Sequence, residues 1–261
     1  MLRFVINLDS STERLESISA RLNELGISFE RMPAVNGRLL LDEQITELTY
    51  PYDHFESKVR YPRELTKGEV GCFLSHRKCW QKLLDSTEDW ALIMEDDILI
   101  SDIAAPYMKS PHWIPNTVQL CQLSCLKAIQ KGKIRQETID IDPTITLVGP
   151  LAPPPVGCQC YLISRSVARL ALKTSQKLVA PVDDFLFSLW FDIANTYTVW
   201  RTSPTLVIPR SDVDSDVGSR AKKDVRKAPF WVRHGLSRFL LEKTVKKIQN
   251  NGSEFVFTFK Q

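Results

Sequence analysis

The chain has 261 residues, of which 43% are hydrophobic and 25% charged, and its formal net charge is +3. This composition is ordinary for a soluble globular protein, and it excludes a chain that is disordered, collagen-like or of low complexity as a whole. The length is that of one large domain or two small ones, and it is sufficient to bury a core without disulfide staples.

The six cysteines contain no Cys-x-x-Cys pair of the kind that binds zinc, and we interpret them as free thiols that serve as small hydrophobic residues. Cys121 and Cys125 have a spacing that could share one helix face, and Cys158 and Cys160 have the same-face spacing of a strand. The start MLRFVINLDS lacks the pattern of a signal peptide, and no apolar run is long enough to cross a bilayer. The sequence therefore predicts a cytoplasmic protein.

Strands and helices alternate in the first third of the chain. Residues 3–8 predict a strand, and the helical spacing that follows predicts a helix that Ser10 or Ser11 caps and Gly26 ends. Residues 27–35 predict a second strand. This order favours a parallel sheet with helices on its faces.

A buried helix is predicted over residues 66–86, where Thr66 and Glu69 have the spacing of a capping box. A hydrophobic strand follows and runs into three consecutive acids. PLAPPPVG, residues 150–157, predicts a loop because proline removes backbone donors. The other expected elements are a short helix over 42–48, strands over 118–124 and 144–149, a strand and then a helix over 158–173, a helix over 181–193 and late strands over 196–210.

The stretch from Arg220 to Lys247 carries ten basic residues against Asp224 and Glu242, interleaved with aromatic and aliphatic residues. This pattern is typical of a basic amphipathic segment that binds an anionic membrane surface. The alternative is a helix that packs its apolar side on the rest of the protein. We therefore divide the chain into a domain over residues 1–220 and a basic amphipathic, helical tail over residues 221–261.

Glu95, Asp96 and Asp97 are the most informative feature of the sequence. They end a hydrophobic strand, which places them at the carboxyl edge of a sheet, where ligands bind in open α/β folds. Three neighbouring carboxylates repel one another unless a cation or a network of donors offsets them. Mg²⁺ and Mn²⁺ prefer such oxygens and commonly bridge a protein to a diphosphate. The alternative is a solvated acidic loop.

A second acidic group comprises Asp212, Asp214 and Asp216. It fails the EF-hand pattern because the required glycine and terminal glutamate are missing. These residues could supply a further metal ligand, but we interpret them as a solvated loop.

Four blocks of this sequence, FVINLDSSTERL, GEVGCFLSHRKCW, ALIMEDDILI and CYLISR, occur in an order that resembles glycosyltransferase family 25. The resemblance spans roughly residues 3–220 and leaves the basic tail uncovered. The sequence departs from the family at Cys158-Gln159-Cys160, where small residues are expected before Tyr161. This departure leaves details of the donor or acceptor pocket open.

The resemblance implies an α/β fold of the GT-A type, with a Rossmann-like mixed sheet flanked by helices, a UDP-sugar donor, and Mn²⁺ or Mg²⁺. It implies that Asp97 is the metal ligand that bridges the cation to the diphosphate, and that Glu95 and Asp96 face the nucleoside or the donor sugar.

Further donor contacts are implied near the first strand and on the buried helix. Asn7, Asp9 and Arg14 fit the recognition of uracil, ribose and phosphate. Ser75 and His76 are expected to contact the donor or to orient a neighbouring group.

Transfer with inversion also requires a base on the acceptor hydroxyl. Asp183 matches the Pro-hydrophobe-Asp position of the family and is our candidate, with Asp184 in reserve and His76 as the alternative. Pro-x-Asp-Asp is also a common helix start, because carboxylates there face the positive end of the helix dipole.

We therefore expect an inverting glycosyltransferase that moves a hexose, preferably galactose from UDP-galactose in β linkage, onto a lipid-linked lipooligosaccharide or lipopolysaccharide. Such an enzyme would lie peripherally on the inner face of the cytoplasmic membrane, with no nucleic-acid partner. One alternative is a UDP-glucose-dependent glucosyltransferase of the same family. Another is a nucleotidyltransferase, but NLDSSTERL lacks its Gly-rich phosphate loop and lysine. A third is a membrane- or nucleic-acid-binding protein that acts through the tail.

Overall fold

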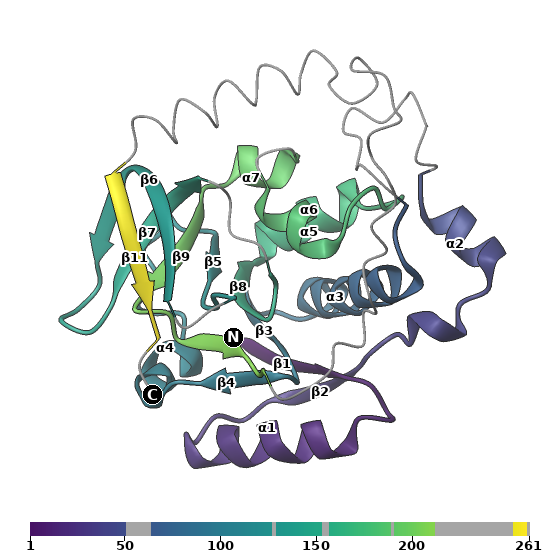
Figure 1. The fold of residues 1–261 in the computed structure, drawn as a ribbon, viewed down its shortest axis with the longest axis horizontal. Helices are drawn as coiled ribbons and strands as arrows, with labels where there is room; N and C mark the ends of the chain where they lie inside the picture. The colour runs from purple at the N-terminus through teal and green to yellow at the C-terminus, as the bar shows by residue number, and fades with distance from the viewer. Residues whose placement is uncertain (51–63, 127–128, 153–156, 189–190, 212–252, 260–261) are drawn as a thin grey trace.

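The computed structural model describes residues 1–50, 64–126, 129–152, 157–188, 191–211 and 253–259. Over these residues, a nine-stranded mixed sheet forms the centre of the molecule (Figure 1). Its strands are β1 (Leu2–Asn7), β2 (Glu30–Pro33), β3 (Trp90–Glu95), β5 (Leu120–Gln122), β6 (Ile129–Asp140), β7 (Thr146–Ala152), β8 (Cys160–Ser164), β9 (Val199–Ser203) and β11 (Ser253–Thr258). Their order across the sheet is β11-β6-β7-β9-β5-β8-β3-β1-β2.

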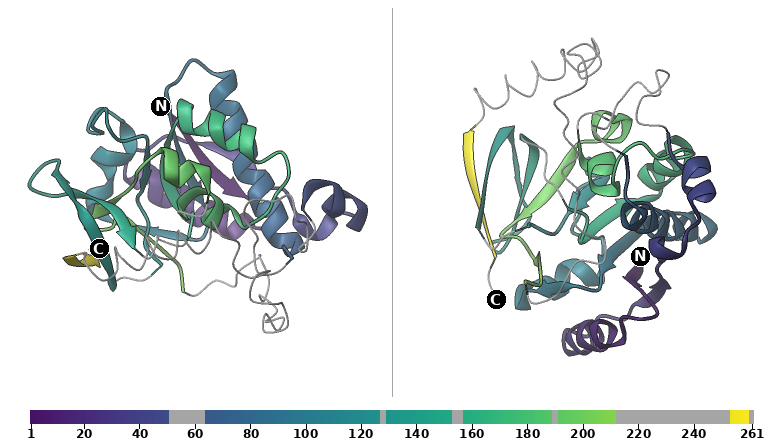
Figure 2. Two further views of the ribbon diagram at one scale, coloured as in Figure 1. Left: turned by 90° about the horizontal axis from the view of Figure 1, so that it is seen from above. Right: turned by 45° about the vertical axis from the view of Figure 1, so that its right-hand side comes forward.

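Helices cover both faces of the sheet. In Figures 1 and 2, α1 (Thr12–Glu24) lies on one side of β1 and β3, and α3 (Lys67–Asp85) lies on the other. A two-stranded sheet of β4 (Ile98–Ile100) and β10 (Val207–Pro209) packs on the α1 side. The remaining helices are η1 (Gly37–Leu39), α2 (Asp42–Leu48), η2 (Asp102–Ala104), α4 (Ala105–Lys109), α5 (Arg165–Thr174), α6 (Val182–Phe187) and α7 (Asp192–Thr196).

Side chains of the central strands alternate between two hydrophobic cores. Phe4 and Ile6 of β1 belong to the core under α3, with Trp80, whereas Val5 belongs to the core under α1, with Leu22. This alternation is the period of two that a strand requires when both of its faces are buried. The strands are therefore fixed in register, and so are the groups at their ends.

The start of α3 is fixed by the predicted capping box. The Thr66 hydroxyl accepts the Glu69 N–H at 3.1 Å, and the Glu69 carboxylate accepts the Thr66 N–H at 2.9 Å. One turn later, Gly71 lets the loop after β2 approach closely. A Cβ at Gly71 would lie 2.6 Å from both the Val35 carbonyl oxygen and the Gly37 nitrogen. Only glycine permits this distance, and so this stretch of α3 positions the loop.

The expected strands and helices of the first third are present, as are the short helix over 42–48 and the strand and helix over 158–173. The second strand is shorter than expected and spans Glu30–Pro33. The Ser11 side chain makes no capping hydrogen bond, and α1 ends before Gly26, whose φ is +65°. All six cysteines are free thiols, as expected.

The prediction of one helix over 181–193 is wrong. The structure has two helices in this region, α6 (Val182–Phe187) and α7 (Asp192–Thr196). Ser188 is extended, with ψ of 133°, and it ends α6. The break returns Phe191 to the same core as Phe185, and their ring centroids lie 5.7 Å apart. The break between the two helices therefore allows both aromatic rings to be buried in the same core.

The expected loop over 150–157 is wrong in its first part, because β7 continues to Ala152. Pro150 is tolerated for two reasons. The pairing of β7 with β9 ends at Val148, and the pairing with β6 shifts register between Ile134 and Glu137. Proline therefore lies at an irregularity in the strand pairing, which is a usual place for proline in a sheet.

Cys121 and Cys125 do not share a helix face, since Cys121 lies in β5. The end of the predicted helical tail, Ser253–Thr258, is a strand that pairs with β6. The rest of the basic stretch and Asp212, Asp214 and Asp216 lie outside the described residues, and the domain division at residue 220 stays a prediction. Among the described helices, none has the length and hydropathy needed to span a bilayer.

We expect Gly71→Ala to lower the free energy of unfolding by about 1–3 kcal/mol, because the added methyl group overpacks the contact with Val35 and Gly37. Thermal and urea unfolding measure this, with Gln81→Ala on the exposed face of α3 as the control. A Gly71→Ala protein as stable as the wild type would show that this contact does not constrain the loop.

Candidate functional site

A pocket of about 280 Å³ opens at the carboxyl ends of β1 and β3. Its walls come from the loops after these strands, the loop after β2, the first half of α3, the segment before β8 and the start of α6. Eight of the ten predicted site residues line it: Asn7, Arg14, Ser75, His76, Glu95, Asp96, Asp97 and Asp183.

The register of the sheet explains why these residues meet. β1 and β3 are parallel neighbours, and Ile6 is paired with Glu95. Asn7 therefore lies beside the acidic triplet, although 88 residues of sequence separate Asn7 from Glu95. β8 runs antiparallel to β3 and starts opposite Met94, which brings the segment before β8 to the same edge.

Asp96 is buried, and donors of the protein surround its carboxylate. The Asn7 amide donates to Asp96 Oδ2 at 2.6 Å, and Arg14 Nη1 lies 3.5 Å from Asp96 Oδ1. Burial raises the pKa of Asp96, and these two neighbours oppose that rise. Arg31 in turn donates to the Asn7 side-chain oxygen at 2.9 Å, which fixes the orientation of the amide.

Asp97 has different surroundings. Its Oδ1 oxygen is buried, and among the described residues it has no hydrogen-bond partner. Burial, with the nearby charges of Glu95 and Asp96, raises the pKa of Asp97 to about 7. A buried carboxylate oxygen without a partner is costly, and a bound divalent cation would satisfy it. The predicted metal ligand thus fits a hard cation.

Glu95 faces a different set of groups. Its Oε1 oxygen accepts a hydrogen bond from the Cys158 thiol at 3.1 Å and lies 3.4 Å from His76 Nε2. The Cys72 thiol is 4.0 Å from the same oxygen. Cys72 and Cys158 are not among the site residues predicted from the sequence. The sequence signal that could have identified Cys72 is its i, i+4 spacing with His76, which places both side chains on one face of a helix.

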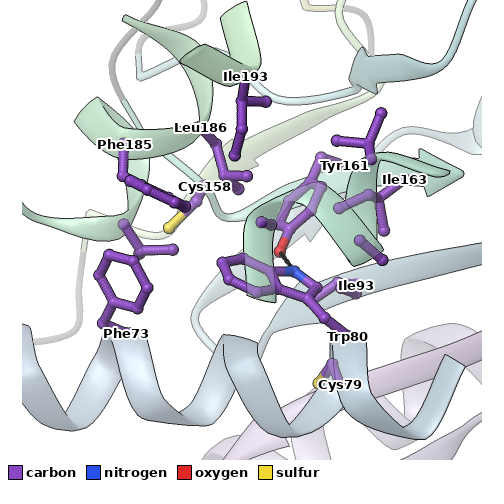
Figure 3. Close-up of a cluster of buried hydrophobic side chains, with 14 of the residues drawn as sticks. Phe73, Cys79, Trp80, Ile93, Cys158, Tyr161, Ile163, Phe185, Leu186 and Ile193 are labelled. Atoms are coloured by element: carbon purple, nitrogen blue, oxygen red, sulfur yellow. Dashed lines mark hydrogen bonds between the residues drawn. The ribbon is translucent and has the colours of Figure 1, made fainter. Parts of the chain in front are cut away.

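His76 is fully buried, and aromatic residues orient it. Its Nδ1 lies 2.8 Å from the Tyr161 hydroxyl, which also accepts the Trp80 indole N–H at 2.9 Å. Figure 3 shows Trp80 and Tyr161 meeting in this core, with Cys158 to the left of them beside Phe185. Burial opposes a charge on His76, but the Cys72 thiol and the Glu95 carboxylate beside it raise its pKa to about 9.

Asp183 lies in the first turn of α6 and is buried, with 7% of its surface exposed. Its Oδ2 accepts the Gly157 N–H at 3.1 Å, and its Oδ1 accepts the Asp184 N–H at 2.9 Å. Asp184 is half-buried and does not line the pocket.

Two other predicted residues have structural partners. The Ser75 hydroxyl accepts the Val35 N–H at 2.8 Å and donates to the Gly71 carbonyl at 2.7 Å, so that it supports the pocket wall. Asp9 is exposed, forms an ion pair with Arg31 and does not line the pocket.

Residues 1–186 match the family model described as glycosyltransferase family 25 (LPS biosynthesis protein). The chain belongs to glycosyltransferase family 25. Its α/β fold, with a mixed sheet flanked by helices, agrees with the expectation from the sequence. The GT-A type of the fold stays a prediction.

Among the relatives of this family 25 chain, procollagen galactosyltransferase 1-B of Xenopus laevis is 34% identical over 95 residues. That match covers 36% of this chain and 16% of the relative. Lipooligosaccharide biosynthesis protein lic2B of Haemophilus influenzae is 29% identical over 113 residues, which cover 43% of this chain and 40% of the relative. The chain thus matches less than half the length of these relatives.

A solved glycosyltransferase involved in glycosylation of the major capsid of PBCV-1 matches 67% of this chain and 65% of its own. The TM-score is 0.32 and the identity is 7%, so this likeness supports no argument about the chain.

Proposed function

We propose that this chain transfers a hexose from a UDP-sugar to a carbohydrate acceptor, with a divalent cation held at Asp97. The buried, unpartnered Oδ1 oxygen of Asp97 is the observation that carries the proposal. The pocket at the sheet edge, lined by the acidic triplet, supports a donor whose diphosphate is joined to the protein through a cation. When bound, Mn²⁺ or Mg²⁺ would offset the charge that develops on the departing UDP.

The residues around Asp97 would bind and orient the donor. Arg14 and Asn7 hold Asp96 in place, so that this carboxylate can accept hydrogen bonds from donor hydroxyls without moving. Arg14 also lines the pocket, where its positive charge favours an anionic diphosphate.

Asp183 is the proposed base on the acceptor hydroxyl. It comes from α6, whereas the acidic triplet follows β3, and the pocket therefore holds carboxylates from two separate elements. Hydrogen bonds from the Gly157 and Asp184 N–H groups hold the Asp183 carboxylate in one orientation. A fixed carboxylate can take a proton from a hydroxyl as that hydroxyl attacks the anomeric carbon with inversion.

Galactose is the proposed donor sugar, and a lipid-linked lipooligosaccharide the proposed acceptor. The names of the Xenopus and Haemophilus relatives support these choices. UDP-glucose is the alternative donor, because the two sugars differ in the orientation of one hydroxyl.

Calorimetry in the presence and absence of Mn²⁺, with UDP, UDP-galactose, UDP-glucose and UDP-GlcNAc, tests the donor site. We expect one UDP-sugar to bind in a metal-dependent way, and Asp97→Asn to weaken that binding on the order of 100-fold, since a cation contributes several kcal/mol.

Asp89→Asn, at an exposed carboxylate, is the control for this experiment. Thermal melting checks that both variants are folded. Normal Mn²⁺ dependence in Asp97→Asn would refute the metal assignment, and a wild-type protein that binds none of the nucleotides would refute the donor.

We expect Asp183→Asn to lower kcat about 10²- to 10⁴-fold with little change in donor affinity, because loss of a general base affects the chemical step. Asp184→Asn is the matched control, since Asp184 is the next residue but does not line the pocket. Equal losses in both variants, or a full rate in Asp183→Asn, would remove Asp183 as the base.

We also propose a peripheral position on an anionic membrane surface at the cytoplasmic face, supported by the charge of residues 220–247. Lys246→Gln with Lys247→Gln should weaken sedimentation with phosphatidylglycerol vesicles about 10- to 30-fold, at about 1 kcal/mol for each lysine. Lys173→Gln with Lys177→Gln on the body is the control. Unchanged sedimentation of the tail variant would refute the membrane contact.

A further inference from the structure

The four side chains of Cys72, His76, Glu95 and Cys158 form a cluster in the wall of the pocket. Their ligand atoms all lie within 4.8 Å of one another. We propose that this cluster binds one Zn²⁺ ion in a tetrahedral site distinct from the cation site at Asp97. The proposal rests on these four side chains and does not depend on the proposed transferase activity.

The chemistry of the cluster selects the ion. Two thiols and an imidazole are ligands for zinc and other borderline or soft metals, whereas Mg²⁺ and Mn²⁺ prefer oxygen. Asp97 offers only carboxylate oxygens, and so the two sites would take different ions. Four protein ligands would fill a tetrahedral zinc site without an open position, as in structural zinc sites.

Four of the six distances within the cluster lie within about 0.5 Å of the edges of a tetrahedron around zinc. Zinc bonds are about 2.3 Å long to sulfur and about 2.0 Å long to nitrogen or oxygen. In a tetrahedral site, these bonds place a sulfur about 3.5 Å from a nitrogen or oxygen ligand, and a nitrogen about 3.3 Å from an oxygen ligand. The Cys158 Sγ–His76 Nε2 distance is 3.5 Å, and the His76 Nε2–Glu95 Oε1 distance is 3.4 Å. From Glu95 Oε1 to sulfur, the distances are 3.1 Å for Cys158 and 4.0 Å for Cys72.

Two elements, α3 and β3, and the segment before β8 supply the ligands. Cys72 and His76 are four residues apart on α3, Glu95 ends β3, and Cys158 lies just before β8. The contact of His76 Nδ1 with the Tyr161 hydroxyl leaves Nε2 facing the cluster. A ligating histidine commonly has such a partner on its other ring nitrogen, which fixes the ring and its tautomer.

The charges also fit a cation. The hydrogen bond with Cys158 and the neighbouring His76 lower the pKa of the Cys72 thiol, whereas the same hydrogen bond and burial raise the pKa of Cys158. Zinc binding would release the protons of both thiols and leave His76 neutral. The two thiolates and the Glu95 carboxylate would then bring three negative charges to the ion's two positive charges.

The site would give Glu95 a new role. Glu95 becomes a metal ligand that joins β3 to α3, while Asp96 remains available to the donor. A zinc ion would also offset the Glu95 charge that acts on Asp97. Cys158, which belongs to the Cys158-Gln159-Cys160 departure from the family pattern, completes the set of ligands.

Titration of the full-length, reduced and chelator-treated protein with Co²⁺ tests the site. We expect one equivalent of Co²⁺ to produce a thiolate-to-cobalt charge-transfer band with the strong visible absorption of a tetrahedral site, and one equivalent of Zn²⁺ to abolish both. Cys72→Ser and Cys158→Ser should each remove or strongly reduce the charge-transfer band. Cys160→Ala, at a buried thiol two residues away in β8, should retain it.

Asp97→Asn separates this site from the donor site. It should retain the thiolate–cobalt band even where it loses Mn²⁺-dependent nucleotide binding, and so either proposal can fail alone. Absence of the band in the wild type, its persistence in Cys158→Ser, or its loss in Asp97→Asn would overturn the zinc site.

A measurement on the wild type covers the case in which the serine variants do not fold. Zn²⁺ should slow alkylation of Cys72 and Cys158 by at least tenfold, as read by peptide mass mapping after timed exposure to iodoacetamide. Equal alkylation rates with and without Zn²⁺ would contradict the proposal. So would a Cys72–Cys158 disulfide in the protein as isolated, if both thiols do not respond to Zn²⁺ after reduction.

Discussion

The parallel pairing of β1 with β3 is the constraint on which the pocket depends. Because Ile6 is paired with Glu95, the two strands end together, and Asn7 meets the acidic triplet at one edge of the sheet. The two hydrophobic cores hold this register, since a slip by one residue would exchange the buried side chains of the two faces. The precision of the site therefore comes from packing along both faces of the sheet as well as from contacts in the pocket.

Three adjacent carboxylates repel one another at this edge of the sheet, and each of them has different neighbours. Asp96 receives donors from Asn7 and Arg14, and Glu95 contacts thiols and an imidazole. Asp97 retains a buried oxygen without a partner among the described residues. The same short acidic sequence thus produces one carboxylate with protein donors, one in a thiol and imidazole environment, and one suited to a hard cation.

Local patterns predicted much of the fold, because capping, periodicity and strand alternation are local properties. The capping box at Thr66, the helix after β1 and the strand before Glu95 all follow from such patterns. β6 and β11 were missed, since the charged and polar residues of β6 show no alternation. Eight of the predicted site residues meet in one pocket, but the contact of Cys72 with Cys158 crosses 86 residues and depends on how β8 pairs with β3.

The position of β11 has a consequence for how the chain acquires its structure during synthesis. β11 covers the outer edge of β6, yet it spans Ser253–Thr258, more than a hundred residues after β6 ends at Asp140. While the ribosome makes those intervening residues, the N–H and C=O groups along β6 have no strand beside them on that side. An emerging chain with such an open edge can pair with another chain, so the growing polypeptide is exposed to aggregation along β6 until β11 has been made.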